Sequence, residues 1–251
     1  MKKILWLMLA IVMTVCLAGV ASAEVKSVPV TLEGDAAEFV TQARAYVQED
    51  SYNYINVGVY VEVSNTGSEY LGIESMGNAI DLLDAEGNVV AGNVYEKWNT
   101  LLGGPDSVAP GEATYFEAPV YFLSKEELNL SLDDIGGVRF TIHRSTSNAS
   151  APQFAGSATA TYDGSKLLKQ MCYTVTGIQE TDFNALMFTA AVFDENHDLL
   201  WVDAQIMSKE KYDQRGGDPL ILEGTTSALA EQWLKASGGE VGEIRAFCYA
   251  Y

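Results

Sequence analysis

The sequence predicts an all-β protein that consists of two tandem β-sandwich domains. Three observations support this fold class. Valines alternate with other residues over residues 57–63, which is the period of a half-buried strand. Short apolar stretches are separated by turn residues along the chain, as in sandwiches of about 100 residues. Four segments of the first half also recur in the second half in the same order, which indicates a duplicated domain.

The recurring segments are roughly 110 residues apart, a spacing that matches a whole domain and not a solenoid unit. The paired segments are 82–90 with 192–200, 96–99 with 210–213, 109–112 with 223–225, and 135–140 with 241–246. We therefore expect the two copies to superpose, with Asp84 over Asp194 and Gly111 over Gly224.

The boundary between the copies is predicted from composition. Residues 145–152 are small and polar and end in a proline, so they cannot bury enough apolar surface to order themselves. We place domain 1 at 24–147, a linker at 148–152 and domain 2 at 153–251.

In domain 1 the first clear strand covers 57–63 and ends at the turn residues of 65–68. Residues 80–83 and 89–90 flank a turn in which Gly87 takes the position that needs a positive φ, which predicts a hairpin. Apolar residues alternate again over 138–142 and predict the last strand.

In domain 2 the matching hairpin consists of residues 185–193 and 199–204. Helix is expected only in short pieces. Residues 124–127 have the pattern of a capping box. The apolar residues of 227–236 fit either a short helix or a strand.

The N-terminus has the features of a secretory signal peptide. Lys2 and Lys3 precede an apolar stretch over 4–17, and Ala21 and Ala23 occupy the two small-residue positions of a signal peptidase site. We expect residues 1–23 to be removed, with cleavage after Ala23, and the remaining protein to be soluble and secreted. An uncleaved membrane anchor and lipidation at Cys16 are the alternatives.

Composition excludes several classes of function. The chain has 34 acidic and 15 basic residues and a net charge of -19, which argues against nucleic-acid binding because phosphates attract Lys and Arg. Two histidines, His143 and His197, and no cysteine cluster leave little material for a zinc site or a histidine-based triad. Oxygen-bearing residues over 194–198 resemble the start of a calcium loop, but a polar turn is favoured. We assign no catalytic, cofactor-binding or metal-binding residue.

Aromatic residues are the best candidates for a binding surface. Domain 1 is rich in them, and by strand alternation Tyr60 points away from the valine face. The segments 96–99 and 210–213 repeat an aromatic residue beside a lysine. The candidate partner-binding residues are Trp98, Tyr95, Lys97, Tyr212, Lys211 and Tyr60. The alternative is structural: these rings cover the outer sheet or the domain junction, or close one end of each sandwich.

Cys172 and Cys248 are the two cysteines that remain after signal removal. Export permits a disulfide between them. Cys248 aligns with the inward-facing Ile142, whereas Cys172 alternates out of phase with Met171 and Val175. Both the bridged and the free state stay open.

The turns carry a resemblance to a known family. The segments 63–66, 82–87 and 109–112 resemble elements of FxLYD-like and related immunoglobulin-like domains of exported bacterial proteins. The second copy departs from the pattern at Glu180 and His197. The resemblance implies two tandem immunoglobulin-like sandwiches that act as a surface or secreted module without catalytic machinery.

These observations favour a secreted, non-enzymatic binding module of the bacterial cell envelope or extracellular space. Its partner would be a protein or another envelope component, with neither nucleic-acid binding nor stable membrane insertion. A pair of carbohydrate-binding modules with exposed aromatic residues is the alternative. A hydrolase with two paired carboxylates is a third hypothesis.

Overall fold

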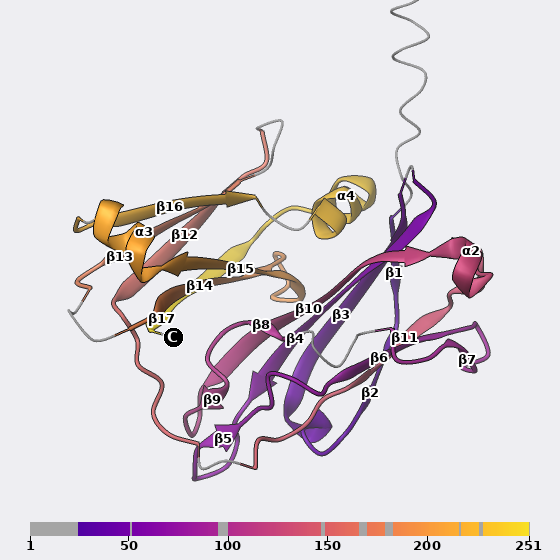
Figure 1. The fold of residues 1–251 in the computed structure, drawn as a ribbon, viewed down its shortest axis with the longest axis horizontal. Helices are drawn as coiled ribbons and strands as arrows, with labels where there is room; N and C mark the ends of the chain where they lie inside the picture. Colours follow the sequence, from indigo (N-terminus) through magenta and orange to yellow (C-terminus); the bar gives the residue numbers. More distant parts are fainter. Residues whose placement is uncertain are drawn as a thin grey trace, which may run out of the picture.

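The structure, a computed structural model, is mostly β (Figure 1). It describes residues 25–50, 52–94, 100–146, 149–165, 170–178, 183–215, 217–225 and 228–250. The predicted signal peptide and residues 95–99 lie outside this part. Residues 25–146 are called the N-terminal half below, and residues 149–250 the C-terminal half. None of the described helices has the length and apolar composition that a membrane span requires.

The N-terminal half has a sandwich-like arrangement of a five-stranded and a four-stranded sheet. The first contains, in spatial order, β1 (Val25–Val28), β3 (Val40–Glu49), β4 (Tyr54–Ser64), β10 (Ala113–Ser124) and β8 (Leu102–Gly103). The second contains β2 (Val30–Glu33), β11 (Gly137–Thr141), β6 (Ala79–Leu83) and β7 (Val89–Ala91). A two-stranded pair, β5 (Leu71–Gly72) and β9 (Ser107–Val108), lies at one end. As the alternation over 57–63 predicts, the valines of β4 are buried in the core.

The C-terminal half contains two three-stranded sheets. One consists of β12 (Ser157–Asp163), β13 (Gln170–Thr176) and β16 (Leu220–Thr225). The other consists of β15 (Leu199–Ser208), β14 (Ala185–Phe193) and β17 (Glu243–Ala250). The short helices are α2 (Lys125–Leu128), α3 (Lys209–Arg215) and α4 (Ala228–Ser237), with 3-10 turns η1 (Ala37–Phe39) and η2 (Leu132–Asp134). Residues 228–236, part of the segment that fits either a helix or a strand by sequence, belong to helix α4. Ser124 accepts a hydrogen bond from the Glu127 amide as the N-cap of α2.

Six strands follow each other and pair in the same way in both halves. In the N-terminal half β3, β4 and β10 form one antiparallel set, and β7, β6 and β11 form the other. In the C-terminal half β12, β13 and β16 correspond to the first set, and β15, β14 and β17 to the second. The strand order along the chain is also the same, which supports the duplication that the sequence predicts.

The hairpin turns at Asp84 and Asp194 agree in detail. The Oδ1 atom of each aspartate accepts hydrogen bonds from the amides two and four residues further on. Each aspartate amide also donates to the carbonyl four residues on, at 2.9 and 3.0 Å. A positive φ falls on the same turn position, at Gly87 and at His197. The turn is therefore fixed by the aspartate side chain, which explains why the second copy tolerates a histidine where the first has glycine.

Two of the other predicted correspondences between the halves differ from expectation in the structure. Gly111 lies in a turn with φ +79°, but Gly224 lies inside β16 opposite Met171, so the expected equivalence of these glycines is wrong. Residues 210–213 belong to helix α3 and not to a loop. Helix α3 nevertheless lies in the connection from β15 to β16. Residues 95–99 lie in the sequence between β7 and β10, the corresponding strands of the first half. The two aromatic segments therefore occupy equivalent positions along the chain.

Candidate functional site

The structure separates the predicted binding residues into three groups. Tyr95, Lys97 and Trp98 lie outside the described residues. Tyr60 is fully buried, so its assignment as a partner-binding residue is wrong. Alternation did place its ring on the outer face of the five-stranded sheet, but the C-terminal half covers that face.

Tyr212 and Lys211 lie on helix α3. The Tyr212 ring contacts the buried Phe183 edge-on, with a centroid separation of 5.3 Å, and Lys209 lies over both rings. Tyr212 is thus partly buried against the C-terminal core, as expected for an aromatic plug. Lys211 is exposed on the same helix.

Three tyrosines of the N-terminal half form the junction between the halves. Tyr46, Tyr60 and Tyr115 project from the outer face of the five-stranded sheet and belong to the C-terminal core. The Tyr46 hydroxyl donates to the Leu200 carbonyl at 2.7 Å, and its ring lies 5.2 Å from that of Trp233 on α4. The C-terminal core therefore includes side chains of both halves, so the two halves are packed against each other.

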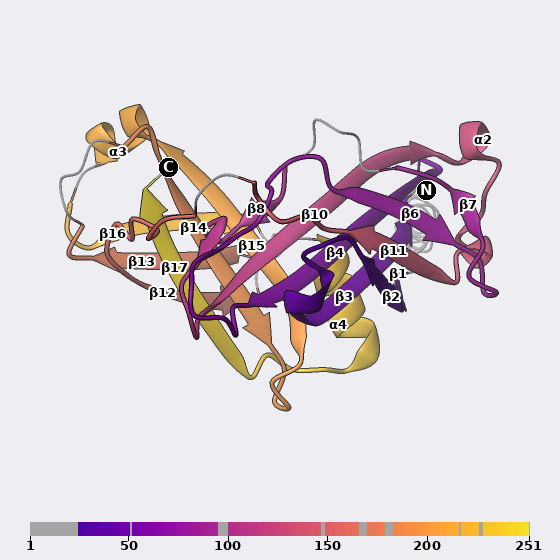
Figure 2. The ribbon, with the colours of Figure 1, turned by 90° about the horizontal axis from the view of Figure 1, so that it is seen from below.

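Other contacts close the edges of this junction. The Gln42 side chain accepts from the Leu199 amide and donates to the His197 carbonyl. At the opposite edge, the Tyr249 hydroxyl donates to the carbonyls of Gly103 and Gly104. Figure 2 shows β15 beside β10 along this contact.

Two carboxyl groups are buried at the junction. Glu117 on β10 is 7% exposed and Asp203 on β15 is 3% exposed. Burial, reinforced by the negative charge of Asp203, raises the pKa of Glu117 to about 8, although a hydrogen bond with Tyr60 opposes the shift. Burial also raises the pKa of Asp203 to about 6, against the hydrogen bond that Tyr173 donates at 2.6 Å. Glu117 therefore carries a proton at neutral pH.

Beyond the covered area, the same outer face continues as an exposed aromatic patch. The patch consists of Tyr52, Tyr54, Tyr121 and Phe122, which are 80%, 37%, 50% and 71% exposed. The Tyr54 and Phe122 rings meet edge to face at 5.9 Å, and the Tyr121 ring lies 6.2 Å from that of Phe122. A contiguous group of exposed rings is a candidate interaction surface.

A small polar network holds the aromatic patch in place. The buried Asn56 side chain accepts a hydrogen bond from the Phe122 amide at 3.0 Å and donates to Asp50 at 3.4 Å. Asp50 in turn accepts from the amides of Tyr52 and Tyr54 at 2.8 and 3.0 Å. Burial acts to raise the pKa of Asp50, but these three hydrogen bonds outweigh it and leave the pKa below its usual value. One network thus fixes both segments that carry the patch.

Phe122 has an uncommon backbone conformation. Its φ is +63°, within a bulge between Val120 and Leu123 where β10 shifts register against β4. A left-handed conformation is costly for a bulky non-glycine residue, by about 1–3 kcal/mol. The exposed Phe122 ring gains no burial that would compensate for this backbone strain. Uncompensated strain of this kind indicates a functional role for the ring.

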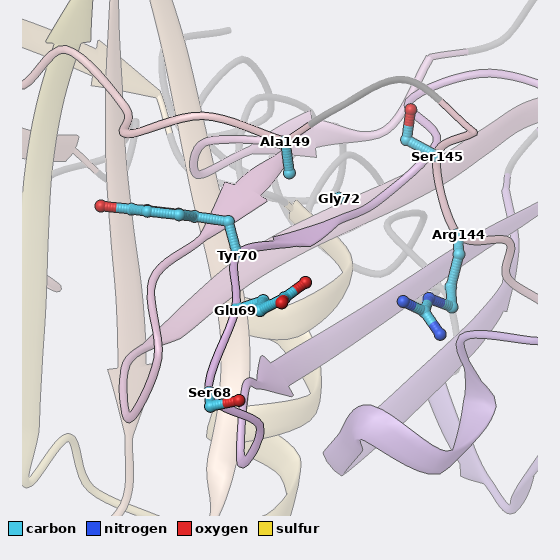
Figure 3. Close-up of a pocket in the computed structure, with 7 residues that line it drawn as sticks. All are labelled: Ser68, Glu69, Tyr70, Gly72, Arg144, Ser145 and Ala149. Carbon is cyan, nitrogen blue, oxygen red and sulfur yellow. The ribbon is translucent and has the colours of Figure 1, made fainter.

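Among the described residues there is also an open polar pocket of about 500 Å³ (Figure 3). It is lined by Ser68, Glu69, Tyr70, Gly72, Arg144, Ser145 and Ala149. Its cation, Arg144, also lies over the Phe39 ring at 5.4 Å, and Tyr70 points away from Arg144. The pocket is shallow, and its single cation and single carboxylate do not define a reaction.

Metal-type ligands do not gather in the described ranges, where no three His, Cys, Asp or Glu side chains are placed to hold an ion. The two histidines are far apart in the fold: His143 contacts Asp35 and His197 contacts Glu243. Cys172 and Cys248 are free thiols, with Cys172 half-buried on β13 and Cys248 buried on β17 of the other sheet.

No protein-family model and no curated protein matches this chain. The resemblance to FxLYD-like domains therefore stays a prediction from the turn segments.

Proposed function

We propose that this protein is a secreted, non-enzymatic binding protein of the bacterial envelope or extracellular space, and that the aromatic patch contacts its partner. The observation that carries this proposal is the exposed Phe122 ring, held at positive φ by the buried Asn56. The predicted signal peptide supports export. The shared strand order of the halves supports the reading of the chain as two tandem immunoglobulin-like sandwiches.

Preorganisation explains why the patch suits binding. Side chains that are already ordered lose little conformational freedom when a partner arrives, so more of the contact energy appears as affinity. Aromatic residues also dominate the energetic centres of protein interfaces. The rings of the patch combine both properties, because the amides of Tyr52, Tyr54 and Phe122 donate hydrogen bonds to Asp50 and Asn56 and so fix the backbone that carries the patch.

The charge of the chain indicates the kind of partner. The net charge is -19, and the exposed acids Glu126 and Glu127 lie on α2, directly after the strand that carries Phe122. Lysine and arginine side chains bind the faces of aromatic rings and are drawn to acidic surfaces. We therefore propose a protein partner that presents a basic segment to the patch.

Replacement of Phe122 by glycine should remove binding without harming the fold. Glycine adopts positive φ at no steric cost, so this variant deletes the ring and relieves the strain together. Against a display library of Lys- and Arg-rich peptides, we expect selected peptides to lose about thirtyfold in affinity, corresponding to a hot spot of about 2 kcal/mol. Binding should also weaken as salt rises.

The matched control is Phe154→Ala, which removes another exposed ring from the C-terminal half and should leave affinity unchanged. If the Phe122 variant keeps full affinity, the patch is not the binding site. If a glycan array yields ligands that depend on Phe122, the carbohydrate-binding alternative is correct. Hydrolysis of a glycan or peptide that is lost on changing one carboxylate would show that the protein is an enzyme.

A further inference from the structure

The junction between the halves buries two acids that come from opposite sides. Glu117 lies on the outer face of β10, opposite Tyr60 on β4, and Asp203 lies on β15, which contacts both strands. Both side chains are nearly inaccessible to water. Ionisation of Glu117 at this buried position is strongly unfavourable, because the side chain is removed from water and the negative charge of Asp203 also acts on it, so Glu117 holds a proton while the junction is closed.

The groups around the two acids do not neutralise them. Tyr60 on β4 is hydrogen-bonded to Glu117 and Tyr173 on β13 donates to Asp203, while Tyr121 on β10 is close enough for its pKa to be affected by both negative charges. Gln205 donates to Asp203 at 3.5 Å.

Glu231 on α4, whose carboxylate accepts from Tyr162 on β12 at 3.1 Å, adds a further negative charge that acts on Asp203. The charges that act on Glu117 and Asp203 within the described part of the chain are thus all negative.

We propose that this acid pair makes the contact between the two halves pH-sensitive: the junction is closed while Glu117 is protonated and loosens when Glu117 and Asp203 are both ionised. Opening would return Glu117 to water, because it lies on a sheet face that the C-terminal half covers. Opening would also uncover Tyr46, Tyr60 and Tyr115 on the same face.

The sign of the effect follows from proton binding. The closed junction raises the pKa of Glu117 from 4.5 to about 8. The closed state therefore binds more protons than the open state between these values, and closure weakens as pH rises. For Glu117 alone, the equilibrium constant for opening should rise by up to about tenfold per pH unit between pH 5 and 8.

Hydroxyl-radical footprinting of the full chain would test this directly. Between pH 5.5 and 8.5 we expect the oxidation rates of Tyr46, Tyr60 and Tyr115 to rise tenfold or more relative to the exposed Tyr52. Phe140 and Trp201 lie inside the two cores and should stay protected, which distinguishes opening of the junction from unfolding.

Two variants separate the acid pair from general charge effects. Glu117→Gln should make the three rates independent of pH within about twofold. Glu112→Gln removes the same charge from an exposed turn and should behave like the wild type. Tyrosines that stay protected at pH 8.5 in the wild type, or that respond equally in the Glu117 variant, would overturn the proposal.

A second measurement covers the case in which the Glu117 variant does not fold. Carboxyl ¹³C NMR of the wild type should show one glutamate that titrates above pH 7. If every glutamate titrates below pH 5.5, the proposal is wrong.

Discussion

Replacement of Tyr46 by alanine should lower the free energy of unfolding by about 3–5 kcal/mol. The ring is fully buried, although it stands on the face of the sheet opposite to the valine core. It contacts the rings of Tyr60 and Trp233, at 5.8 and 5.2 Å, and its hydroxyl donates to the Leu200 carbonyl. Truncation would leave a large cavity between the two halves.

Urea unfolding of the Tyr46 variants measures this effect. Tyr46→Phe is the matched control, because it keeps the ring and removes only the hydrogen bond, at a cost of about 1 kcal/mol. Loss of the ring should destabilise the C-terminal half in particular, since Tyr46 belongs to its core. A loss below about 1 kcal/mol for Tyr46→Ala would mean that the halves are not packed together in solution.

Alanine at Gly136 and at Gly242 should destabilise the protein by a similar amount, about 3 kcal/mol each. Each glycine amide donates at 2.8 Å to the carbonyl that precedes an aspartate turn, Leu83 in one half and Phe193 in the other. A Cβ atom at Gly136 would lie 2.5 Å from the Ala85 backbone, and one at Gly242 would lie 2.5 Å from the Asp194 carbonyl oxygen. Backbone cannot move aside as a flexible side chain can.

Gly87→Ala, in the same hairpin as Gly136, is the control for this pair. Its φ is +85° but open space surrounds it, so the substitution should cost only about 1–2 kcal/mol of backbone strain. Thermal unfolding of the three variants compares them on one scale. If one of the Gly136 and Gly242 variants is strongly destabilised and the other is as stable as the wild type, the two turns are not equivalent.

The sequence predicted the hairpins well because their determinants are local. Asp84 and Asp194 fix the turns through hydrogen bonds within five residues, and strands β6 and β14 end directly before these two aspartates. The same locality explains why β4 was recognised, since its valine alternation lies within one strand.

The junction and the aromatic patch depend on contacts distant in sequence, so the sequence could not predict them. Alternation placed Tyr60 on the outer face but could not show that β15 would cover it. The sequence does contain a local sign of the buried Glu117, because it is a lone acid between aromatic and apolar neighbours in β10. The bulge that exposes Phe122 depends on Asn56, 66 positions away, and no local pattern reveals it.

The contribution of the N-terminal half to the C-terminal core also means that the two halves cannot fold in either order. Within the described residues, the N-terminal core draws only on residues between 28 and 142, so it can assemble as soon as that segment is available. The C-terminal core draws on Tyr46, Tyr60 and Tyr115 and is incomplete without them. The first half therefore serves as a template on which the second completes its packing, and a C-terminal half expressed alone should remain loosely packed.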